Sequence, residues 1–282
     1  SRRGEDNIRK AIELFTRATE TDPGFARAWS SLAAAHITLP AYSVTESVEV
    51  HYGLARQYAE EALSLDPTIA DAHAALGDMA RTENDWLEAE SHYRQAIQLE
   101  PNNSTGYLWY AEHLGSVGHV EESLTMALKA VELDPFNAGA NAVTGNVFVL
   151  NGDRANAEKY LRAAIDLGHP FTIYGLVFLR IEAGDLAAAE RVVETEISSV
   201  DQLQRETISR YIAAVRDPDK AESWFAWMRD NFPDNPADRV VHSIRFGRTD
   251  EAIEMLDSIR PVANDWIPFW RPVAEPIRRH PL

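Results

Sequence analysis

The sequence predicts an all-α fold, a right-handed superhelical solenoid of helix–turn–helix repeats. Two observations lead to this prediction. A tripeptide of leucine, an acidic residue and proline occurs three times at intervals of 34 residues, ending at Pro67, Pro101 and Pro135. An alanine stands five residues before each of these prolines. A fixed period of this length is typical of stacked two-helix units and not of a single globular core.

The unit from 71 to 101 explains the period. Two stretches carry apolar and small residues at spacings of three and four, which predicts two helices, the second from about Leu87 to Leu99. Asn84 and Asp85 lie between them and favour a turn. The closing proline cannot continue a helix, so it ends the unit. Small residues are expected where the helices approach closely and large ones beside them: Gly77, Ala89 and Ala96 are small, and Leu76 and Tyr93 are large.

This pattern of residues resembles the tetratricopeptide repeat, a two-helix unit that usually holds a partner. The unit at 69–101 carries the pattern most cleanly, and the units at 103–135 and 137–168 repeat it. Upstream, Phe15 belongs to the second half of a unit, and Trp29 opens the next one. The resemblance implies roughly seven to eight units, or about fifteen helices, along the chain.

The unit that Trp29 opens is longer than the others. It has ten residues more than the unit that follows it, and the extra residues fall around 39–50. Ser43 and Glu46 have the spacing of a capping box. We therefore predict a long helix that starts at this box and ends at about Leu65.

Downstream of residue 168 the pattern weakens but continues. Gly184 predicts a turn between two helices, and Gly247 predicts another. Ala221, Phe225 and Met228 recover the spacing of a second helix. The sequence therefore divides into a regular array at 1–168, divergent repeats at 169–260 and a tail rich in proline and aromatic residues at 261–282.

The tail has two interpretations. Its prolines forbid a regular helix, while Trp266, Phe269 and Trp270 carry too much apolar area to remain in water. The tail can fold back and cap the last helix pair near Ile253 and Leu256, or it can be a proline-rich ligand for another protein. We favour the cap because the ends of a solenoid need covering.

Composition and charge exclude several classes of function. The chain has 45% hydrophobic and 25% charged residues, as an ordinary soluble protein does. Its net charge of −17 argues against direct binding to nucleic acid or to an anionic membrane, and it either favours basic partners or serves solubility alone. No apolar run approaches the roughly 18 residues of a membrane span. The opening at 1–6 reads as a charged approach to a helix and not as a signal peptide, so we expect a cytoplasmic protein.

The search for catalytic chemistry is negative. The chain has no cysteine, which excludes disulfides and thiolate catalysis. None of the nine histidines has the spacing of a helical zinc site, and His113 and His119 are six residues apart across a turn. Neighbouring carboxylates such as Glu60 and Glu61 point apart on a helix. We therefore expect no metal, no cofactor and no enzyme activity.

The resemblance also implies where a partner binds. In such arrays the first helix of each unit lines the concave surface, so its inner positions are expected to be exposed. Some of these modules hold the carboxylate of chaperones with a clamp of lysine, asparagine and arginine, but this chain has Ala34, Asp78 and Glu112 at such positions. Acidic and amide groups there suit a basic or amide-rich peptide, although the same residues can simply be solvated. The candidate partner-binding residues are Asp71, Asp78, Arg81, Glu112 and Asn146.

A finer resemblance concerns the residues from Asn84 to Ile97, the stretch from Tyr107 to Ala111 and the ending Pro276–Leu282. They are similar to the C-terminal repeat region of bacterial signalling chains, which follows a nucleotidyl-cyclase, protein-kinase or winged-helix domain. The sequence therefore predicts a non-enzymatic interaction or regulatory module. One alternative is a sensor that encloses a small molecule in the superhelix. A further one is an enzyme with its site in residues 170–282.

Overall fold

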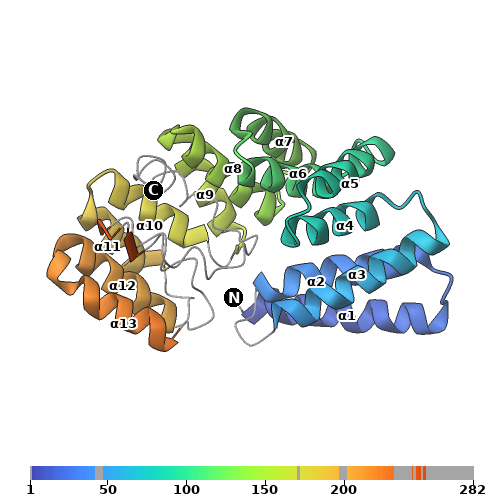
Figure 1. The fold of residues 1–282 in the computed structure, drawn as a ribbon, viewed down its shortest axis with the longest axis horizontal. Coiled ribbons are helices and arrows are strands. Elements are labelled where there is room, and N and C mark those ends of the chain that lie inside the picture. The colour runs from blue at the N-terminus through green and yellow to red at the C-terminus, as the bar shows by residue number, and fades with distance from the viewer. Residues whose placement is uncertain are drawn as a thin grey trace.

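The protein is described by a computed structural model over residues 2–41, 47–169, 172–196, 202–231, 243, 246–248, 250 and 251. Within these ranges it contains thirteen α-helices and no β-strand, which confirms the all-α prediction. The helices follow one another along an arc whose ends are α1 and α13 (Figure 1). The helices are α1 (Arg2–Thr21), α2 (Ala26–Thr38), α3 (Val48–Leu65), α4 (Ala70–Thr82), α5 (Trp86–Leu99), α6 (Ser104–Ser116), α7 (Val120–Leu133), α8 (Ala138–Asn151), α9 (Arg154–Asp166), α10 (Thr172–Glu182), α11 (Leu186–Glu196), α12 (Gln202–Arg216) and α13 (Ala221–Asn231).

The contacts between helices define an inner and an outer layer. The most extensive contacts pair α2 with α3, α4 with α5, α6 with α7 and α8 with α9. The first helices of these pairs also pack on one another, α2 on α4, α4 on α6 and α6 on α8, whereas the second helices scarcely touch. The stack therefore curves with α2, α4, α6 and α8 on its concave side, as the repeat pattern predicts.

Glycine and alanine decide how closely the two helices of a pair approach. A Cβ atom on Gly77 of α4 would lie 2.9 Å from the ring of Tyr93 on α5. A Cβ atom on Gly145 of α8 would lie 2.8 Å from two side-chain atoms of Leu161 on α9. In the unit between them the equivalent residues are both alanine and both fully buried, Ala111 and Ala127. Each large residue thus fits where the opposite helix has no side chain.

Three of the prolines that end a unit also anchor the next inner helix. Six residues after Pro23, the indole nitrogen of Trp29 donates to that proline's carbonyl oxygen at 2.9 Å. The equivalent nitrogen of His73 lies 3.1 Å from its own proline's carbonyl oxygen. The amide nitrogen of Asn141 donates to the third such oxygen at 3.0 Å. Three different side chains therefore satisfy the same backbone acceptor at the start of a helix.

The long unit departs from its prediction at one point. Helix α3 begins at Val48, and the hydroxyl of Ser47 caps it by accepting from the amide of Val50. The start therefore lies later than predicted, while the end at Leu65 agrees. The proposed capping box of Ser43 and Glu46 lies outside the described residues.

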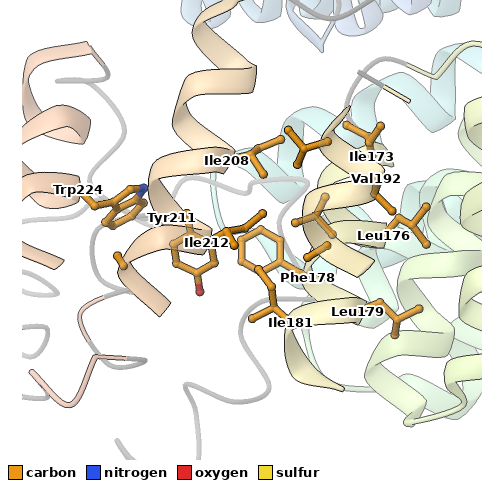
Figure 2. Close-up of a cluster of buried hydrophobic side chains, with 14 of the residues drawn as sticks. Ile173, Leu176, Phe178, Leu179, Ile181, Val192, Ile208, Tyr211, Ile212 and Trp224 are labelled. Carbon is orange, nitrogen blue, oxygen red and sulfur yellow. The ribbon is translucent and has the colours of Figure 1, made fainter. Parts of the chain in front are cut away.

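The divergent half continues as paired helices. The turn predicted at Gly184 separates α10 from α11, and its φ of 75° suits glycine. Ala221, Phe225 and Met228 are buried on α13, as their spacing predicts. Figure 2 shows the core that joins these helices, with Phe178 of α10 beside Tyr211 and Ile212 of α12.

Two predictions concern residues that the structure does not describe. The tail at 261–282 and its capping site near Ile253 and Leu256 lie outside the described ranges. The second turn is covered only in part, at 246–248, 250 and 251. The cap and the external-ligand interpretation of the tail both remain predictions.

Candidate functional site

The inner helices bring several of the predicted site residues onto the concave side. Asp71 is half-buried on α4, Glu112 is half-buried on α6 and Asn146 is half-buried on α8. The carboxamide oxygen of Asn146 lies against Gly175 of α10, one unit further along the arc. These three side chains therefore occupy successive inner helices, as the repeat pattern predicts.

Asp78 and Arg81 correct the sequence prediction. Asp78 was expected at an exposed inner position and Arg81 was proposed as a partner contact, but each is only 2% exposed. The guanidinium of Arg81 donates twice to one carboxylate oxygen of Asp78, through Nε at 2.9 Å and Nη2 at 2.6 Å. Helix α4 packs on α5 and on the inner helices α2 and α6, and Tyr93 of α5 lies beside the pair, so these neighbours cover the two side chains. The pair is therefore part of the interior beneath the concave surface.

A buried tyrosine joins this pair to α6. The hydroxyl of Tyr93 is fully buried and has no hydrogen-bond partner of good geometry, with Arg81 as the cation near it. Burial, followed by the charge of Asp78, raises the pKa of Tyr93 well above its ordinary value, and Glu112 adds to the effect. The structure thus brings three of the five candidates, Asp78, Arg81 and Glu112, around one buried hydroxyl.

His113 stands next to the same group. Its ring packs on Tyr93 at a centroid distance of 5.5 Å and on Trp86 at 6.1 Å. Burial, followed by the positive charge of Arg81, lowers the pKa of His113 to about 4. The imidazole is therefore neutral at physiological pH and acts as a packing residue.

A second polar network surrounds Asp71. The side-chain amide of Asn103 donates to a carboxylate oxygen of Asp71 at 2.6 Å and to one of Glu100 at 3.1 Å. Arg27 of α2 forms an ion pair with Glu100 at 3.6 Å. Burial raises the pKa of Asp71 above its ordinary value, even though the bond from Asn103 opposes this shift. The network links the starts of α2, α4 and α6 along the concave side.

Sequence reasoning missed Asn103 and Glu100. Asn103 caps α6, because its carboxamide oxygen accepts from the amide of Thr105 at 2.9 Å. An asparagine just after a repeat proline is a signal for such a cap. The bond across to Asp71, 32 residues away, has no signal in the sequence.

Histidines on neighbouring helices also meet. The Nδ1 atoms of His36 and His51 are 2.7 Å apart, and those of His73 and His92 are 3.2 Å apart. His73 donates from Nε2 to a carbonyl oxygen, so its Nδ1 accepts from His92 when both rings are neutral. Over the ranges that the structure describes, no three histidine or carboxylate groups are arranged to hold a metal ion. No helix in those ranges is both long and apolar enough to cross a membrane.

Known proteins resemble this chain in sequence and in fold. The family model of the tetratricopeptide repeat matches residues 70–103, which are α4, α5 and the turns around them. The crystal structure of PilW, a widely conserved type IV pilus biogenesis factor, has a similar fold with a TM-score of 0.57 at 22% identity. The alignment covers 74% of this chain and 94% of that one.

Two curated relatives match parts of the sequence. Hsp70-Hsp90 organizing protein 3 of Arabidopsis thaliana is 37% identical over 70 residues, which are 25% of this chain and 12% of that protein. Transcriptional regulator HilA of Salmonella typhimurium is 22% identical over 134 residues, which are 48% of this chain and 24% of that protein. The matched stretches thus span a quarter or less of these relatives.

Proposed function

We propose that this chain, which carries a tetratricopeptide repeat at residues 70–103, is a non-enzymatic module that holds a protein or peptide partner on its concave face. Repeats of this kind offer an extended surface made of successive inner helices. In this chain that surface carries carboxylate and amide groups on α4, α6 and α8. Such groups accept hydrogen bonds from a peptide backbone and attract basic side chains.

The network around Asn103 is the observation that supports this proposal most directly. Its amide lies between the carboxylates of Asp71 and Glu100, and Arg27 holds Glu100 from the other side. The polar groups are therefore oriented before any partner arrives, which lowers the entropy lost on binding. A cation of the partner that meets Asp71 and Glu100 would add to an arrangement that already exists.

The buried group beneath this surface has a supporting role in the proposal. Asp78 and Arg81 cannot contact a partner directly because both are buried. Their ion pair and the hydroxyl of Tyr93 lie beside Glu112, and we assign them to positioning that carboxylate. Asp71, Glu112 and Asn146 are then the direct contacts.

We also propose that the module works within a bacterial signalling or regulatory protein. The finer sequence resemblance points to the C-terminal regions of such chains. The match to the regulator HilA over 48% of this chain is consistent with this context. The proposed partner is a protein or peptide of basic character, met in the cytoplasm, and the module makes no contact with nucleic acid.

Peptide binding tests the proposal. Fluorescein-labelled peptides of basic, neutral and acidic composition are titrated with the full chain, and fluorescence anisotropy is measured in increasing salt. We expect the basic peptides to bind, with affinity that falls as salt rises. The double variant D71N/E112Q should weaken this binding, and the control E60Q/E61Q removes the same charge from the exposed face of α3.

Three results would reject the proposal. Equal binding of all peptide compositions would show no preference for basic partners. Equal weakening by the control would show that total charge, and not the concave face, attracts the peptide. Stabilisation by a compact metabolite, without binding of any peptide, would favour the small-molecule sensor instead.

A further inference from the structure

We propose that one edge of the solenoid is a second docking surface, separate from the concave face, for a basic segment that carries an apolar anchor side chain. This surface, which we name the Trp86 edge, consists of residues 83–87, where the turn after α4 leads into α5, and residues 116–119, where α6 ends and turns towards α7. The two turns are neighbours because Trp86 packs on His113 in the last turns of α6.

Three apolar side chains are exposed on the Trp86 edge, although the repeat does not require them. Leu87 is 82% exposed, Val117 is 37% exposed and Trp86 is 36% exposed. One repeat later, the residues equivalent to Leu87 and Val117 are Glu121 and Asn151. Polar side chains therefore fit these places, so packing within the array does not explain the apolar ones. Exposed apolar residues that gather in one place mark interaction sites, and tryptophan is enriched at the centres of interfaces.

The Trp86 edge is formed before any partner binds. Residues 83–87 line a shallow, open depression on the surface. Asn84 adopts a left-handed conformation with φ of 65°, and Asp85 caps α5 by accepting from the amide of Glu88 at 3.1 Å. The turn is therefore held in one shape, and an apolar side chain of a partner can pack against it at little cost in ordering.

The charge around the Trp86 edge selects a basic partner. Residues 70–133 contain eleven acidic and only three basic side chains. Each of the three basic side chains already pairs with a carboxylate of its own helix: Arg81 with Asp78, Arg94 with Glu90 and Lys129 with Glu132. Glu88 and Glu122 remain largely exposed on or beside the turns, and Glu83, which is also exposed, pairs with Arg56 of α3 at 2.7 Å. This field attracts a basic segment and repels both an anionic lipid surface and a second copy of the chain.

A designed peptide pair tests the proposal. The probe is a short fluorescein-labelled amphipathic peptide of lysine, leucine and tryptophan, and its twin has glutamate in place of each lysine. We expect the full chain to bind the lysine peptide and not its twin. L87S should weaken binding by about tenfold because an apolar contact with the peptide is lost. Leu87 is exposed, so the substitution should leave the fold intact. E88Q/E122Q should weaken binding more than the matched control E60Q/E61Q.

NMR locates the bound peptide on the protein without relying on its affinity. Amide chemical shifts should change at 83–88 and 116–122 when the lysine peptide binds, and L87S should reduce these changes without altering any changes around Asp71 and Glu112. Shift changes confined to the residues around Asp71 and Glu112 would place the peptide on the concave face and would overturn the proposal. Equal binding by L87S and the natural sequence, or equal loss with E60Q/E61Q, would overturn the proposal. Dimerisation that L87S abolishes would assign the edge to a second copy and would also overturn it.

Discussion

Replacement of Gly145 by alanine tests how the helices of a pair fit together. The added Cβ would lie 2.8 Å from the Cγ and Cδ2 atoms of Leu161 and 2.9 Å from its backbone nitrogen. A backbone atom cannot move aside without shifting α9. Leu161 is fully buried, so its side chain has no free space to enter.

The magnitude follows from two opposed effects. Alanine favours a helix over glycine by about 1 kcal/mol, whereas overpacking a core costs about 1–3 kcal/mol. Because the contact includes backbone, we place the strain near the upper limit and expect a net loss of about 1–2 kcal/mol for G145A. L161A alone should cost about 2–5 kcal/mol through the cavity it leaves. In the L161A background G145A should become stabilising, because the pair then matches the natural Ala111 and Ala127 one unit earlier.

Urea denaturation of the four proteins in this cycle measures the effect. The coupling free energy between positions 145 and 161 should be about 2–3 kcal/mol, with a change of sign for G145A between the two backgrounds. A coupling below about 0.5 kcal/mol, within ordinary additivity, would refute the argument that Gly145 is required by Leu161.

Three further predictions concern the polar groups around the site. The pKa of His113 in the folded state, about 4, lies below its pKa in the unfolded chain. The stabilisation that comes from burying the neutral imidazole is therefore complete above the unfolded pKa, and it is lost as pH falls from there towards the folded pKa. About 2 kcal/mol should be lost at pH 5, and H113Q should show a flatter dependence of unfolding free energy on pH. D78A should lower the free energy of unfolding by about 3–5 kcal/mol because it leaves Arg81 buried without its counter-ion. Replacing both residues by leucine should cost less stability. Equal losses would show that the pair is not coupled. N103A should cost about 0.5–2 kcal/mol through the lost helix cap, and Asp71 should then titrate at a higher pH by NMR; an unchanged titration would contradict the network.

The period of 34 residues was sufficient to predict α4 as a helix and α5 nearly to the residue. The turn at Asn84, the close approach at Gly77 and the end at Pro101 are all encoded within one unit, and each acts on its immediate neighbours. Helix α3 shows the limit of such local signals. Two serines four residues apart can each cap a helix, and Ser47 is the one that caps α3.

The candidate site shows the same difference between what local sequence signals predict and what they cannot. Asp71, Glu112 and Asn146 lie on successive inner helices because their positions within the repeat determine that face. The partner that each residue meets depends on the helix packed against it, and the bond from Asn103 to Asp71 crosses 32 residues. Sequence reasoning could therefore place the face but not the network.

The sequence by itself determined the type of fold, the positions of the repeat boundaries and the acidic character of the central units. The tertiary structure alone decided which inner residues reach the surface. Asp78 has an inner position in the repeat and yet is buried with Arg81, because α4 packs on α2, α5 and α6 and the rotation between units sets that packing. Curvature sums small rotations between units that lie far apart in sequence, and no single repeat encodes that sum.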